Sequence, residues 1–173
     1  MKTRILIFFT VAVLLSCDHP EKPENEGGTD GFSYQTEQFA DIRILRYQVP
    51  GFDTMTLKQK KLIYYLSQAA LCGRDITCDQ NCRYNLLIRK SLEAIYQHSP
   101  VDRTSEAFKQ FEIYLKRVWF SNGIHHHYST DKFFPEINRE YFMELLMGVP
   151  VGKLPLGSQS QKDFATELTG LVF

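Results

Sequence analysis

The sequence lacks an excess of charge of either sign, because its 20 lysines and arginines balance its 20 aspartates and glutamates. Without a basic excess there is little charge to displace counterions from a phosphate backbone, so the composition predicts no nucleic-acid partner. No unit of roughly 20–50 residues repeats along the chain, which argues against a solenoid. With 173 residues, 43% of them hydrophobic, the chain is long enough to bury a core as one ordinary domain.

Cysteine is also scarce, with four residues in the whole chain. Cys72, Cys78 and Cys82 lack the paired Cys-x2-Cys spacing of structural zinc sites. Outside the cytoplasm, one disulfide between Cys72 and either Cys78 or Cys82 is compatible with this spacing, and so are free thiols. The spacing alone leaves the two states open.

The N-terminus lacks an apolar run long enough to cross a bilayer as a helix. Lys2 and Arg4 precede the apolar residues 5–15, and a small residue followed by Cys17 ends the pattern of a signal peptide. Segment 1–17 resembles a bacterial lipoprotein signal, in which Cys17 is lipidated. An ordinary secretory signal is the alternative. Both predict export from the cytoplasm. Lipidation further predicts a place in the cell envelope, with a lipid anchor on the periplasmic side or on the outer-membrane surface.

Residues 18–38 are rich in proline, glycine and acids and contain little that could be buried. Such a segment gains too little from burial to offset the entropy of ordering, so we predict a flexible linker. The folded part is then expected to cover residues 39–173.

Residues 39–173 predict a mainly α fold, with about five amphipathic helices and one short extended segment over residues 42–49. Apolar residues recur at helical spacing between recognisable cap and stop residues. The predicted helices run from Thr56 to Gly73, from Tyr84 to Ser99, from Thr104 or Ser105 to Trp119, from Asn138 to Gly148, and from Ser160 to Leu171. We also expect Phe164, Leu168 and Leu171 of the last helix to form an apolar face without a partner inside this sequence.

One stretch, residues 119–129, has the composition of a site, with three adjacent histidines inside the chain. In extended backbone only His125 and His127 point the same way, so a tetrahedral zinc site needs a further ligand such as Asp131. This spacing lacks the helical pair that positions a metal and a base, so no native metal is expected here. Adventitious nickel or zinc binding, and polar loop residues bonded to neighbouring backbone, are the alternatives.

Four segments together resemble the N-terminal region of bacterial dipeptidyl peptidase III. They are FADIRILRYQVPGF (39–52), LIYYLSQAAL (62–71), YLKRVWFSNGIHHHY (114–128) and KFFP (132–135). The resemblance implies a zinc exopeptidase that removes dipeptides from the N-termini of short peptides. It also implies two lobes around a wide cleft, with this chain forming part of one lobe.

The zinc ligands and the general base of that family lie on an HExxGH helix and a following glutamate motif. No histidine in this sequence is followed by glutamate, so none of these residues can be carried over. Zinc is therefore expected in the full-length family, and none is expected to be bound natively by this chain. We expect the chain to be a leading segment that stops before the catalytic lobe.

The candidate substrate-binding residues are Ser121, Asn122, Gly123, His126 and Tyr128, in a loop that would form the peptide-facing wall of the cleft. Polar side chains there can pair with a peptide backbone, and glycine permits close approach. The alternative is that Asn122 and Gly123 only cap a helix.

Two hypotheses follow for the whole chain. It is either the N-terminal segment of a lipid-anchored dipeptidyl peptidase, inactive alone, or a non-catalytic, lipid-anchored lipoprotein that binds peptides or acts as a scaffold. Short peptides are the expected partners in the first case, and the membrane is a partner through the anchor in both.

Overall fold

The computed structural model describes residues 31–173. The predicted signal segment, the lipidation site Cys17 and most of the predicted linker lie outside the described residues. The described part is mainly α-helical with one small sheet, which confirms the predicted fold class. Its elements are β1 (Gln35–Phe39), β2 (Ile42–Leu45), α1 (Leu57–Cys72), α2 (Arg74–Cys78), α3 (Asn85–His98), α4 (Glu106–Ser121), α5 (Arg139–Met147), the 3-10 turn η1 (Val151–Lys153) and α6 (Gln161–Val172).

The helices begin where the cap residues predict. Thr56 forms a complete capping box with Gln59 at the start of α1. The side chains of Ser105, Asn138 and Ser160 likewise accept a hydrogen bond from the third residue of α4, α5 and α6. Each such bond satisfies an amide that the helix itself leaves without a partner.

Two elements differ from the prediction. The antiparallel hairpin of β1 and β2 begins at Gln35, inside the segment predicted as a linker that runs to residue 38. The connection after α1 contains the short helix α2, which ends at the buried Cys78. The sequence pattern does not predict this hairpin, because β1 is polar and ion pairs with α4 stabilise the hairpin in place of a buried apolar face. Lys116 pairs with Glu37 at 2.7 Å, and Arg117 pairs with Asp41 at 2.6 Å.

The hydrophobic core lies among α3, α4, α5 and α6. Its largest fully buried side chains include Tyr114, Phe108, Phe111 and Phe142. The prediction of an unpartnered face on the last helix is wrong. Phe164 and Leu168 are 3% and 0% exposed, and Leu171 packs against the same core.

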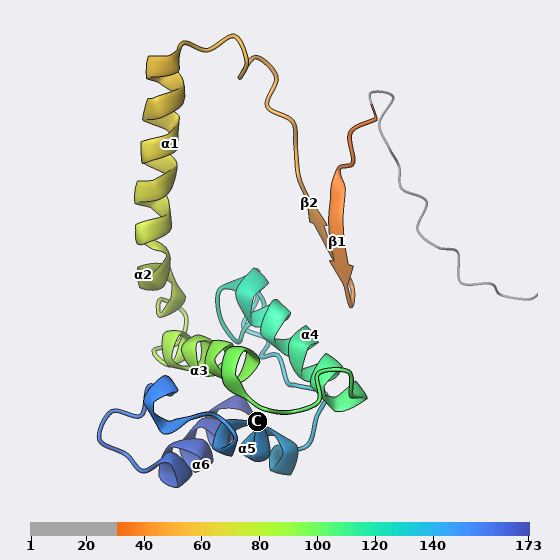
Figure 1. The fold of residues 1–173 in the computed structure, drawn as a ribbon, viewed down its shortest axis with the longest axis vertical. Helices are drawn as coiled ribbons and strands as arrows, with labels where there is room; N and C mark the ends of the chain where they lie inside the picture. The colour runs from red at the N-terminus through yellow and green to blue at the C-terminus, as the bar shows by residue number, and fades with distance from the viewer. Residues whose placement is uncertain (1–30) are drawn as a thin grey trace, which may run out of the picture.

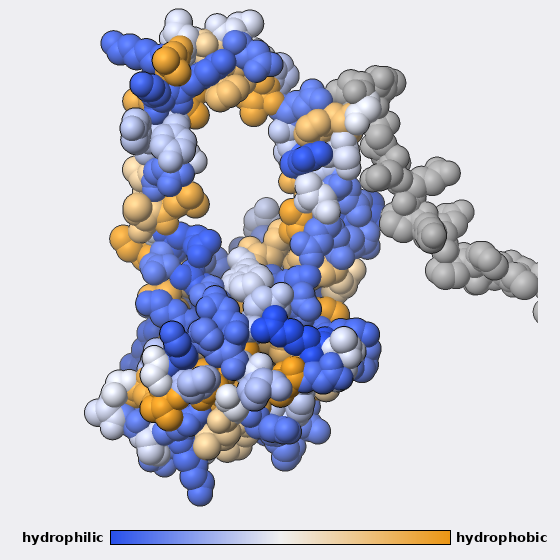
Figure 2. Space-filling model, in the orientation of Figure 1, coloured by the Kyte–Doolittle hydropathy of each residue, from blue (hydrophilic) through white to orange (hydrophobic). Residues whose placement is uncertain are grey.

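The helix without a covered face is instead α1, none of whose 16 residues is buried. Its side chains Leu62, Ile63 and Leu66 are 59%, 41% and 61% exposed. Figure 1 shows α1 rising from the helical core through α2, with the hairpin on the opposite side. In the space-filling view an opening separates α1 from the hairpin (Figure 2). Among residues 31–173, no helix combines the length and the apolar character needed to cross a membrane.

Candidate functional site

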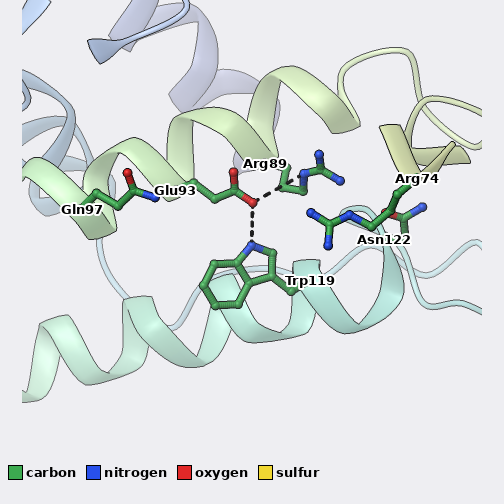
Figure 3. Close-up of a pocket in the computed structure, with 6 residues that line it drawn as sticks. All are labelled: Arg74, Arg89, Glu93, Gln97, Trp119 and Asn122. Carbon is green, nitrogen blue, oxygen red and sulfur yellow. Dashed lines mark hydrogen bonds and ion pairs between the residues drawn. The ribbon is translucent and has the colours of Figure 1, made fainter. Parts of the chain in front are cut away.

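A hollow of about 530 Å³ lies where α2, α3 and the end of α4 meet (Figure 3). Arg74 enters it from α2 and Trp119 from α4, and Asn122 follows α4 directly. The remaining lining residues are Arg89, Glu93 and Gln97, which recur every four residues along α3. Side chains four apart lie on one face of a helix, so α3 presents a polar stripe to the hollow.

Glu93 is the centre of the contacts inside the hollow. Its Oε1 accepts a hydrogen bond of 2.9 Å from the indole Nε1 of Trp119 and lies 3.6 Å from Nε of Arg89. No contact uses its second carboxylate oxygen in the part of the chain that the structure describes. Glu93 therefore fixes the orientation of the Trp119 ring and keeps one oxygen available.

Arg89 forms the inner wall and is 4% exposed. Its Nη2 donates to Asp75 Oδ1, and its Nη1 donates to Cys78 Sγ at 3.5 Å. Burial is the largest single effect and lowers the pKa of Arg89, but the hydrogen bond with Asp75 and the charges of Cys78, Asp75 and Glu93 together outweigh it, so the pKa of the guanidinium is raised. The same hydrogen bond lowers the pKa of Asp75. Arg89 is thus a buried charge that has a paired carboxylate.

Cys78 is a buried thiol within this network. It donates to the main-chain oxygen of Asn122 at 3.6 Å, and burial raises its pKa. Cys72, Cys78 and Cys82 are all free thiols in the structure. A buried thiol with a raised pKa is a poor nucleophile, so Cys78 acts in packing.

Arg74 differs from Arg89 in that its guanidinium makes no hydrogen bond or ion pair with any described residue. In Figure 3 it extends into the hollow, toward Trp119 and Glu93, with no dashed line. Gln97, at the far end of the α3 stripe, is exposed and its carboxamide is also unpaired within residues 31–173. The hollow therefore contains one cation and one amide group that are free to bind a ligand.

Asn122 is the member of the predicted site that lines this hollow. Its backbone is left-handed, with φ of 55°, and it caps α4, as the alternative interpretation predicts. Its Nδ2 donates to Thr77 Oγ1 at 2.8 Å, which ties the end of α4 to α2. The side-chain oxygen of Asn122 accepts no bond from the described residues. Capping and a contact with a ligand are therefore compatible at this residue.

Gly123 permits a close approach, but to its own chain. A Cβ at this position would lie 2.3 Å from Nδ2 of the buried Asn85. Asn85 donates to the main-chain oxygen of Cys78 at 2.8 Å and accepts from the amide of Ile124 at 3.1 Å. Asn85 therefore joins α3 to α2 and to the loop after α4, and Gly123 makes room for it.

Ser121 lies apart from the other predicted residues. Its side chain is 9% exposed, its hydroxyl has no hydrogen-bond partner, and it lines none of the hollows described here. The predicted contact of Ser121 with a substrate backbone has no support from this position.

His126 and Tyr128 lie in the loop that follows α4. The ring of His127 lies between those of His126 and Tyr128, with its centroid 4.5 Å from that of His126 and 4.2 Å from that of Tyr128. Nδ1 of His126 accepts from the amide of Tyr128 at 3.2 Å, and Tyr128 is 88% exposed. Tyr128 borders a second hollow of about 400 Å³, which is also lined by Asn81, His125, His127, Ser129 and Thr130. His126 and Tyr128 thus form an outer surface separate from the Arg74 hollow.

The histidine loop does not gather a metal-ligand set. Among residues 31–173, no three side chains of histidine, cysteine, aspartate or glutamate are close enough to hold a metal together. Asp131, the further ligand that the sequence suggested, instead accepts a hydrogen bond from Ser129 Oγ at 2.8 Å. The residues present therefore do not fit the zinc of the peptidase family.

Comparison with known proteins adds no assignment. No family model matches the chain, and no curated protein matches it either.

Proposed function

We propose that this chain is the N-terminal segment of a zinc-dependent exopeptidase that releases dipeptides from the N-termini of short peptides, and that it is inactive alone. Its resemblance to the dipeptidyl peptidase III family is the basis of the proposal. The zinc and catalytic residues of such an enzyme have no counterpart in this sequence. No catalytic step is therefore assigned to a residue of this chain.

The observation that carries the proposal is the uncovered helix α1. Helices in proteins owe most of their stability to the packing of an apolar face against another element, and α1 buries none of its residues. Yet α1 exposes Leu62, Ile63 and Leu66, which lie in one of the segments that resemble the family. The second lobe of a peptidase, or a further part of the same lobe, would supply the missing contact surface.

The hollow beside Asn122 supports a peptide-facing role for this lobe. It offers the guanidinium of Arg74, one carboxylate oxygen of Glu93 and the carboxamide of Gln97, none of which has a partner among the described residues. Such groups bind peptide backbones and termini. His126 and Tyr128 lie outside this hollow, in the row of neighbouring rings that also contains His127. Lipidation of Cys17 and a place in the cell envelope belong to the same proposal and rest on the sequence alone.

The alternative is a non-catalytic, lipid-anchored lipoprotein that binds peptides or acts as a scaffold. The observation that favours it is that one hollow of this chain brings together a cation, a carboxylate and a tryptophan, namely Arg74, Glu93 and Trp119. The gene sequence downstream of Phe173 distinguishes the two functions. A continuing reading frame that encodes HExxGH supports the peptidase, whereas a stop codon without that motif supports the lipoprotein.

The purified chain is expected to release no product from dipeptidyl-naphthylamide substrates, because it contains neither the zinc ligands nor the general base of the family. The assay compares the chain with added zinc, the chain with a chelator, and buffer. Turnover that zinc supports and the chelator abolishes would show that the chain holds a catalytic site and would contradict the proposed inactivity.

A further inference from the structure

We propose that the hollow between α2, α3 and the end of α4 is a binding site for a short peptide with both termini free. Arg74 would bind the carboxylate of the peptide, Glu93 would bind its ammonium, and Trp119 would contact the chain between them. The inference names a ligand for the wall described under the proposed function, but binding needs no catalytic lobe and can be measured on this chain alone.

The charges in the hollow select a ligand that carries both signs. Asp75 and Glu93 both pair with the single buried cation Arg89, so these three side chains together carry one net negative charge. Arg74 adds a cation to the same hollow and forms no ion pair with Glu93 or with any other described residue. A zwitterion matches this arrangement, whereas a dianion such as phosphate would meet the carboxylate of Glu93 without compensation.

The inner wall has a donor that the protein itself leaves unused. Nε of Arg89 is buried and donates no hydrogen bond, since its nearest acceptor, Oε1 of Glu93, is 3.6 Å away. Buried donors normally have partners, because an unsatisfied one costs free energy. The Gln97 carboxamide and the Asn122 side-chain oxygen lie at the two ends of the hollow and have no partner among residues 31–173. An amide-containing ligand can pair with these two groups.

Trp119 gives the site a fixed apolar surface. It is 42% exposed, and its indole nitrogen is held by Glu93 at 2.9 Å, so the ring presents a defined face. An aliphatic side chain or the ammonium-bearing carbon of a peptide can pack on such a face. The volume of about 530 Å³ lies within the range of roughly 300–1,000 Å³ typical of small-molecule sites.

The test uses Trp119, which is the only tryptophan in the chain, as the reporter. The chain is titrated with alanyl-leucine while tryptophan emission is followed, and a saturable blue shift is expected as the ligand covers the ring. N-acetylated and C-amidated forms of the dipeptide should each bind about tenfold more weakly or worse, because each lacks one charge.

Two matched pairs of variants test the assignment of the ends. Arg74→Gln should weaken the free dipeptide about tenfold or more and leave the C-amidated form unaffected. Glu93→Gln keeps an oxygen for the indole and should weaken the free dipeptide but leave the N-acetylated form unaffected. Arg43→Gln and Glu136→Gln make the same charge changes at exposed residues outside the hollow and should leave binding unchanged.

Three results would overturn the inference. They are no saturable change with the free dipeptide, equal affinity for the amidated or acetylated forms, and inorganic phosphate that competes with the dipeptide more strongly than acetate does. The last result would indicate an anion site at Arg74. Thermal melts of Arg74→Gln and Glu93→Gln, followed by circular dichroism, are compared with the melt of the Arg43→Gln control. Equal melting temperatures show that a variant has lost binding and not folding. A titration without binding contradicts the peptide site but not the proposed peptidase. A downstream gene sequence without HExxGH contradicts the proposed peptidase but not the peptide site.

Discussion

Replacing Leu168 with alanine is expected to lower the free energy of unfolding by about 2–5 kcal/mol, which is the range for a leucine deleted from a packed core. Leu168 is fully buried on α6, the helix that packs against α5. The same replacement at Leu62 of α1, where the side chain is 59% exposed, is expected to change it by less than about 0.5 kcal/mol.

Urea unfolding followed by circular dichroism at 222 nm measures both variants against the unsubstituted chain. The two substitutions delete the same atoms from two helices, so only the surroundings differ. Equal effects at the two positions would mean that α1 is covered in solution, by another copy or by a rearrangement of the chain. The expected difference would locate the stability of the chain in the α3–α6 core.

Gly123→Ala is expected to lower the free energy of unfolding by about 2–4 kcal/mol. The new Cβ would lie 2.3 Å from the Asn85 side chain, which is buried and has two hydrogen bonds. Displacing Asn85 leaves the oxygen of Cys78 and the amide of Ile124 without partners, and each buried unsatisfied group costs about 1–3 kcal/mol. Gly152→Ala is the control, because nothing lies within 4 Å of a Cβ there.

A double substitution isolates the contact that this prediction depends on. Asn85→Ala is itself destabilising, but it removes the group that the Gly123 methyl would meet. The loss of unfolding free energy in the double variant should therefore be smaller than the sum of the losses in the two single variants, by about 1 kcal/mol or more. Strict additivity in thermal unfolding would show that Gly123→Ala acts through backbone strain at its φ of 158° and not through Asn85.

The sequence predicts local structure well wherever a short-range interaction decides it. Thr56, Ser105, Asn138 and Ser160 begin helices because a side chain three residues before an amide can bond to it. A helix end at Asn122 follows from the left-handed conformation that asparagine tolerates. These features depend on neighbours in the chain, which the sequence displays.

The sequence does not predict which apolar face is covered, because that depends on distant elements. Helices α1 and α6 both carry apolar residues at helical spacing, yet only α6 packs against the core. The hairpin illustrates the same limit, since its ion pairs join residues 76 and 79 positions apart. Such pairings leave no periodic signal.

The candidate site is predictable only in part for the same reason. Residues 119–129 identify Asn122, but the hollow also needs Arg74 from α2 and the stripe of Arg89, Glu93 and Gln97 from α3. That stripe, at spacing four beside the apolar face of α3, is a signal that the sequence contains. The histidines attract attention first, although their rings form an outer surface and not the wall of this hollow.

The bare helix α1 has a consequence for how the molecule moves. A helix with no buried side chain loses almost no packing when it frays, so its backbone can open to water while the core stays folded. Amide protons of α1 should then exchange with solvent far faster than those of α3 and α4, although all three are regular helices. The helices α3–α6 therefore form the stable part of the chain, whereas the stability of α1 depends on whether a partner packs against it. A partner bound to α1 would suppress its local unfolding and slow the exchange of its amide protons.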